Sequence, residues 1–174
     1  MGDLLFPAGF LATFTGYSVH TALHYAAHRG RTERLSRGAD ALATMILFIG
    51  YAGFGLMLAT DPVTLGRSGM IAIFGGIVGI SGVALFGAAV RSKRGFEETA
   101  DLVTTGIYSR LRHPMYLGIL LIHIGFPLLT DSALSLLSAG LWAPQILLWK
   151  RWEDEELGER FGEKYREYRR KTFF

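Results

Sequence analysis

The 174-residue sequence contains no cysteine. Without thiols the chain can form no disulfide framework, no thiolate metal site and no cysteine nucleophile, so several enzyme classes are excluded. The net charge is also small, at +3, and charged residues are missing from long stretches of the chain. The placement of the few charges therefore carries more information than their sum.

Long uncharged segments fill the rest of the sequence. Half of the residues are hydrophobic and the mean hydropathy is +0.29, which is unusual for a soluble domain of this size. A helix of about 20 apolar residues matches the ~30 Å hydrocarbon core of a bilayer. Five segments qualify, at residues 4–27, 41–60, 70–90, 115–130 and 132–149. We therefore expect an all-α integral membrane protein with five transmembrane helices in a single membrane domain, residues 1–174.

The fourth and fifth segments are separated only by the residues around Asp131, which leaves room for a tight turn. These two segments are predicted to form a helical hairpin. The third segment carries five glycines and directly follows a sixth, Gly69, and Gly75 and Gly79 form a small-xxx-small pair. Close packing against a neighbouring helix is the favoured interpretation, and a groove that admits a ligand against bare backbone is the alternative.

The basic residues indicate the orientation of the chain. All Lys and Arg except Arg67 lie in the first loop, in the third loop at 91–114, or in the tail at 150–174. Five spans place these three segments on one side, which the positive-inside rule makes cytosolic, with the N-terminus outside. Topology and anionic membrane lipids account for the basic clusters, so we expect no nucleic-acid partner.

The tail is predicted to form a cytosolic amphipathic helix. At about 100° per residue, an apolar stripe is formed by Leu157, Phe161, Tyr165 and Tyr168. Glu153 and Asp154 flank that stripe and are expected to face the protein, whereas Glu155 and Glu156 are expected to face solvent. Glycines at 158 and 162 argue against a continuous helix, because each destabilises a helix by ~1 kcal/mol relative to alanine.

The third loop ends in a second polar motif. Tyr108 is followed by Arg112, His113 and Pro114, and proline suits the first turn of the fourth helix. The motif therefore lies at a helix N-terminus, where free N–H groups and the helix dipole favour a carboxylate or phosphate. Loop and tail share the cytosolic side, and together they suit a zwitterionic, ribose-bearing cofactor.

Histidines in two spans allow more than one interpretation. His20, His24 and His28 are spaced four apart on one face of the first helix, and His123 is alone in the fourth. Polar packing or anchoring is favoured over a metal or haem site for the first three, because no further ligand completes a set. A hydrogen bond to a neighbouring helix is favoured over a substrate contact for His123. No metal site is assigned.

Taken together, the motifs resemble the superfamily of isoprenylcysteine carboxyl methyltransferases and phospholipid methyltransferases, which are integral membrane enzymes. The shared pattern is Gly-x-Tyr, Arg-His-Pro-x-Tyr-x-Gly, a hairpin, an acidic pair and Phe-Gly-x-x-Tyr-x-x-Tyr. The resemblance covers about the last 70 residues. One departure is Ser109, which stands where these proteins often have Arg.

The resemblance implies a site for S-adenosylmethionine roofed by the loop and tail and open to lipid. It assigns cofactor binding to eight residues: Gly106, His113, Pro114, Tyr116, Leu117, Gly118, Glu153 and Asp154. Catalytic roles fall to Arg112, Tyr108 and Glu153. The expected function is methyl transfer to a lipophilic substrate that arrives from the bilayer. Two alternatives are an NADPH-dependent reductase of the sterol-reductase type and a non-catalytic bundle that binds haem, metal or a partner.

Overall fold

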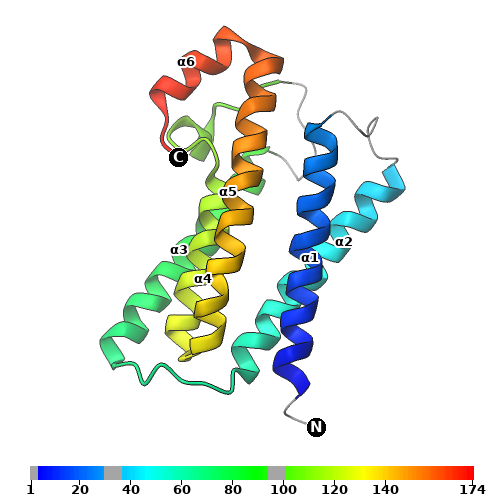
Figure 1. The fold of residues 1–174 in the computed structure, drawn as a ribbon. Coiled ribbons are helices and arrows are strands. Elements are labelled where there is room, and N and C mark those ends of the chain that lie inside the picture. Colours follow the sequence, from blue (N-terminus) through cyan, green and yellow to red (C-terminus); the bar gives the residue numbers. More distant parts are fainter. Residues whose placement is uncertain (1–3, 30–36, 94–100) are drawn as a thin grey trace.

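The computed structural model describes residues 4–29, 37–93 and 101–174, and this part of the chain is helical without a β-strand (Figure 1). The helices are α1 (Leu5–His28), α2 (Arg37–Thr60), α3 (Gly69–Lys93), the short 3-10 helix η2 (Gly106–Ser109), α4 (Pro114–Thr130), α5 (Ala133–Phe161) and α6 (Glu163–Lys171). The predicted all-α fold is confirmed. α4 and α5 form the predicted hairpin, with Asp131 in a left-handed conformation at the turn (φ 64°).

In the described residues 101–174, no separate tail helix begins at residue 150. α5 continues for 29 residues to Phe161, so the acidic pair lies on the same helix as the fifth apolar segment. The chain breaks only at Gly162, whose positive φ of 54° is readily available to glycine. The expected tail helix is therefore divided between the end of α5 and the separate helix α6.

Five membrane spans are not established by the structure. Among the described residues, length and composition single out one helix, α3, whose most apolar 18-residue window has a mean hydropathy of 2.1 and is only 22% buried. Two further apolar helical segments, Thr44–Thr60 and Pro114–Thr130, are shorter. α1 carries three histidines, and α5 runs on into charged residues.

Glycines allow α3 to pack closely against α4, its most extensive partner. A Cβ atom added to Gly82 would lie 2.6 Å from the carbonyl oxygen of Gly118, and one added to Gly75 would lie 2.6 Å from the Leu128 Cβ. Both distances are too short for side-chain atoms, so the two backbones touch directly. The packing interpretation is confirmed for Gly75, Gly79 and Gly82, whereas a Cβ added to Gly69 or Gly87 would meet no atom of the described residues within 4 Å.

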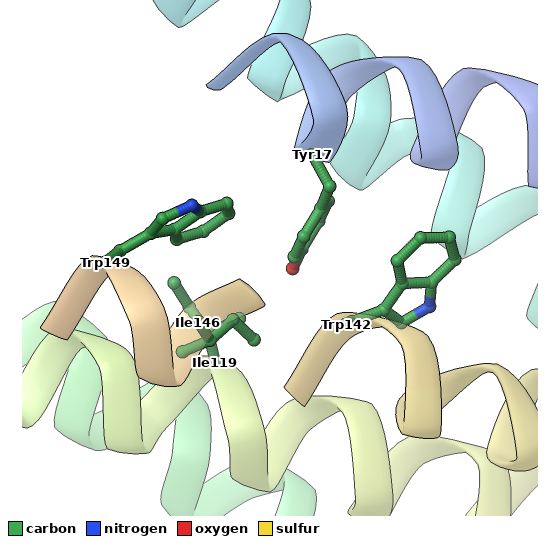
Figure 2. Close-up of a cluster of buried hydrophobic side chains, with 5 residues drawn as sticks. All are labelled: Tyr17, Ile119, Trp142, Ile146 and Trp149. Atoms are coloured by element: carbon green, nitrogen blue, oxygen red, sulfur yellow. The ribbon is translucent and has the colours of Figure 1, made fainter. Parts of the chain in front are cut away.

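A buried aromatic cluster joins α1 to the hairpin (Figure 2). The Tyr17 ring projects from α1 between two tryptophans of α5, with ring centroids 5.3 Å from Trp142 and 5.2 Å from Trp149. The Tyr17 hydroxyl also lies 3.1 Å from His123 Nε2. This contact confirms the predicted interhelical hydrogen bond of His123.

The chain after Gly162 folds back over the loop before α4 (Figure 1). The Tyr168 hydroxyl donates a hydrogen bond of 2.7 Å to the Tyr108 carbonyl oxygen. Leu111 and Phe173 then form an isolated parallel bridge, in which the Arg112 N–H donates to the Phe173 carbonyl. We call this end of the bundle, with residues 101–113 and α6, the loop end.

Candidate functional site

His113 is the central side chain at the loop end. It is the N-cap residue of α4, with Pro114 in the first turn as the sequence predicts. Its imidazole is directed toward α5, where it contacts Asp154. The side chain is only 1% exposed, which means that its polar atoms depend on protein partners.

Those partners are the predicted acidic pair. His113 Nε2 lies 2.8 Å from Asp154 Oδ1, and His113 Nδ1 lies 3.6 Å from Glu153 Oε2. Both ring nitrogens therefore face a carboxylate, an arrangement that suits an imidazolium donating from both sides. The loop and the acidic pair meet in space, as we expected from the sequence.

Each carboxylate has a second basic neighbour. Lys93 Nζ of α3 lies 3.6 Å from Glu153 Oε1, and Lys150 Nζ lies 3.0 Å from Asp154 Oδ2. The Tyr165 hydroxyl of α6 donates a further hydrogen bond to Asp154 Oδ1. The site thus ties α3, α5, α6 and the start of α4 together through ion pairs and hydrogen bonds.

These contacts shift the ionisation of the group. Burial opposes the charged form of His113, but its hydrogen bonds to Asp154 and Glu153 prevail and raise its pKa above 6.5. Burial also opposes ionisation of Glu153, yet the hydrogen bond with His113 and the charge of Lys93 lower its pKa to about 2. The pKa of Asp154 is lowered in the same way, chiefly by His113 and Tyr165 against the effect of burial.

A cavity of about 300 Å³ opens beside this group. That volume is at the lower end of the range for small-molecule sites. Its wall includes five of the residues assigned by the resemblance, which are Tyr108, Arg112, His113, Tyr116 and Glu153. The Glu153 side chain is 27% exposed, so its carboxylate is accessible from the cavity while held by His113 and Lys93.

The other residues assigned by the resemblance do not line the cavity. Asp154 lies behind His113 and fixes its ring. Gly118 packs against α3, where a Cβ would lie 2.7 Å from the Gly82 carbonyl oxygen. Gly106 has a positive φ of 61° and lies next to Ser92. Neither Pro114 nor Leu117, both in the first turn of α4, belongs to the wall.

Sequence reasoning missed two parts of the wall. Lys93 is the last residue of α3 and belongs to a basic stretch of the sequence. Nothing in the sequence indicates that it pairs with Glu153. His20 and His24 were noticed for their spacing, but only the structure places both on the cavity wall, together with Trp149. The described residues hold no group of three His, Cys, Asp or Glu side chains positioned to bind a metal ion.

The geometry offers two kinds of recognition. The Glu153 carboxylate can accept hydrogen bonds from an ammonium or hydroxyl group, and Arg112 offers a guanidinium on the same wall. Apolar and aromatic side chains complete the cavity, among them Leu47, Phe86 and Ile119. The cavity therefore suits a charged, hydrogen-bonding ligand bound next to a lipophilic molecule.

The fold and this site define an all-helical protein whose charged cavity is assembled from a loop and the end of a helical hairpin. The chain matches the family described as phospholipid methyltransferase over residues 68–164, which is more than half of its length, and it belongs to that family. The match runs from the start of α3 into α6 and includes His113 and the acidic pair. No curated protein and no solved structure matches the chain. Members of this family are membrane-associated methyltransferases, which supports an enzyme acting on a lipid-type substrate.

Proposed function

We propose that the protein transfers the methyl group of S-adenosylmethionine to a lipophilic acceptor at the cytosolic face of a membrane. The observation that carries this proposal is the Glu153 carboxylate, held by His113 and Lys93 on the wall of a partly apolar cavity in a phospholipid methyltransferase family member. Such a carboxylate suits the ammonium and ribose hydroxyls of this cofactor.

The remaining roles follow from the cavity wall. Arg112 lines the cavity and offers a partner for the cofactor's carboxylate. When bound, the cofactor supplies an electrophilic methyl group on a sulfonium. The protein's own contribution is to hold the two reactants in line and exclude water, and alignment of this kind is worth ~7–11 kcal/mol. Asp154 acts indirectly, because its hydrogen bond orients the His113 ring that contacts Glu153.

We further propose a multi-pass membrane protein with its loop end in the cytosol. The basic residues of α6 lie at that end of the bundle. The positive-inside rule places such residues on the cytosolic side. Large apolar side chains are exposed along α3, with Met70 79%, Ile73 66% and Ile80 64% exposed. An apolar face of this length suits contact with lipid chains.

The direct test is titration of S-adenosylhomocysteine into the detergent-purified full chain by isothermal calorimetry. We expect saturable binding, and Glu153→Gln should weaken it by about 1.5–3 kcal/mol through loss of charge-assisted hydrogen bonds. Glu155→Gln is the matched control, because Glu155 is two residues away, exposed and paired with Arg151. No binding at millimolar ligand, or equal affinity in both variants, would contradict the proposal.

NADPH serves as the comparison ligand, because a membrane reductase is the alternative enzyme class. A protein that is protected against thermal unfolding by NADPH and not by S-adenosylhomocysteine would reverse the assignment. We expect the opposite pattern, since the chain belongs to the phospholipid methyltransferase family.

A further inference from the structure

The cavity has a second wall whose chemistry differs from that of the charged site. α1 and α2 contribute six residues to it: His20, His24, Thr44, Leu47, Phe48 and Tyr51. None of these six carries a fixed charge. The cationic residues of the cavity come instead from α3, the loop and the distal part of α5. We call the six residues the α1–α2 wall.

Within this wall, His20 and His24 form a contacting pair. Their ring centroids are 4.4 Å apart, with the rings in a T-shaped arrangement. The His20 ring also contacts Trp149 at 4.5 Å, and the His24 ring stacks on the same indole at 6.2 Å. The Trp149 indole N–H donates to Thr21 Oγ1 over 2.9 Å, which fixes the surface that supports both imidazoles.

The indole that contacts the histidine pair lies one helical turn from the proposed cofactor carboxylate. Trp149 and Glu153 are four residues apart on α5, so they share a face and differ by about 6 Å along the helix axis. Both residues line the same cavity. A methyl donor held at Glu153 and an acceptor lying on Trp149 would therefore be neighbours.

An acceptor at this wall meets imidazoles and no fixed positive charge. Two imidazoles in contact disfavour double protonation, so at least one keeps a lone pair that can accept a hydrogen bond or a proton. A carboxylate acceptor needs no base and is best held by a cation, but the cations of the cavity, Lys93, Arg112 and Arg160, all lie outside the α1–α2 wall. Lys93 is paired with Glu153, and the proposed function assigns Arg112 to the cofactor's own carboxylate. The wall instead suits an uncharged N–H or O–H group.

We propose that His20 and His24 bind the acceptor group and take its proton, so that the substrate is a lipophilic molecule with an uncharged N–H or O–H nucleophile. This inference rests on the proposed methyltransferase function. The acceptor's lone pair forms the new bond to the methyl carbon while the carbon–sulfur bond breaks, and the bonding electrons remain on sulfur as a neutral thioether. The acceptor's proton passes to an imidazole nitrogen of the pair and then to solvent.

The test uses three matched probes, 4-dodecylphenol, 4-dodecylaniline and 4-dodecylbenzoic acid, with methyl-labelled S-adenosylmethionine and the purified full chain. We expect transfer to the phenol or the aniline and none to the benzoate. His20→Gln with His24→Gln should lower kcat by about 100-fold or more, the range for loss of a general base. The KM for the probe and the affinity for S-adenosylhomocysteine should change little by comparison.

His28→Gln is the matched control. It lies one turn beyond His24 on the same helix, contacts Glu155 at 3.2 Å and is not part of the cavity wall, so kcat should be unchanged. Partial recovery of the His24→Ala variant by added imidazole would separate proton transfer from packing against Trp149. Retained binding of S-adenosylhomocysteine reports that each variant is folded.

Three outcomes would overturn the inference. They are methylation of the benzoate, phenol or aniline transfer undiminished in the double variant, and no transfer to any probe while S-adenosylhomocysteine still binds. Absence of S-adenosylhomocysteine binding to the unaltered protein would instead remove the proposed function itself. The two failures are thus distinguishable.

Discussion

The imidazole of His113 and the carboxylate of Asp154, 41 positions apart in the sequence, are joined by a hydrogen bond of 2.8 Å. This bond connects the first residue before α4 to the distal part of α5. Because His113 also contacts Glu153, the orientation of one buried ring determines where the accessible carboxylate points. Four predictions follow from this and other contacts of the bundle.

The first prediction concerns the pH dependence of stability. The folded-state pKa of His113 is raised above 6.5, so its ionic contribution is complete below that pH and is lost as the pH rises through the raised value. We expect the unfolding temperature of the protein to fall on going to alkaline pH, and to fall less steeply in His113→Gln. Thermal scans in detergent between neutral and alkaline pH measure this, and parallel slopes would contradict it.

The second prediction separates Asp154 from its exposed neighbour. Asp154 accepts hydrogen bonds from His113, Lys150 and Tyr165, and its side chain is only 15% exposed. Asp154→Asn should cost about 1.5–3 kcal/mol in the free energy of unfolding, because it leaves a buried imidazolium short of a charged partner. Glu155→Gln, at an exposed ion pair, should stay within about 0.5 kcal/mol. Equal effects in chemical denaturation would refute this distinction.

The third prediction tests the contact between α3 and α4. Gly82→Ala places a methyl group 2.6 Å from the Gly118 carbonyl oxygen, so the helices must move apart at a cost of about 1–3 kcal/mol. Gly87→Ala, on the same helix with no atom within 4 Å of the added carbon, should be neutral or stabilising by up to about 1 kcal/mol. Thermal unfolding of both variants checks the difference. An unchanged unfolding temperature in Gly82→Ala would contradict the prediction, because it would show that α3 and α4 can move apart without cost.

The fourth prediction concerns the attachment of α6 to the loop. Tyr168→Phe removes the hydrogen bond to the Tyr108 carbonyl, which should cost about 0.5–1.5 kcal/mol. Amide hydrogen exchange in residues 106–112 should accelerate, because the loop then loses its hydrogen bonds with the Tyr168 hydroxyl of α6. Arg166→Gln alters an exposed ion pair of the same helix and serves as the control. Unchanged exchange in Tyr168→Phe would mean that the backbone bridge of Leu111 with Phe173 holds the loop by itself.

The helical segments and the hairpin could be predicted from the sequence because apolar length and a short turn are local properties. The inward face of the acidic pair was also predictable, since Tyr165 and Tyr168 are buried as the apolar stripe requires. The length of α5 could not be predicted from the sequence. Polarity changes sharply after Trp149, but a helix needs only its own backbone hydrogen bonds to continue, and no proline or other breaker interrupts them between Trp149 and Gly162.

The composition of the cavity was less accessible to sequence reasoning. Lys93 and Glu153 meet only because α3 and α5 end at the same level of the bundle. Gly118 stands inside a motif associated with the cofactor, yet its own position is fixed by Gly82 on another helix. Contacts of this kind depend on how helices are rotated against one another, which spacing along one chain does not specify.

Because α5 is continuous from Ala133 to Phe161, its length fixes how far Glu153 lies from the hairpin turn. From Ala133 to Glu153 an α-helix rises by about 30 Å, which equals the thickness of a hydrocarbon core. If α5 crosses the bilayer as we propose, the Glu153 carboxylate would lie among the lipid headgroups, at a depth set by the geometry of the helix. An acceptor drifting in the leaflet would then find the methyl donor at the level of its own polar end, without leaving the bilayer.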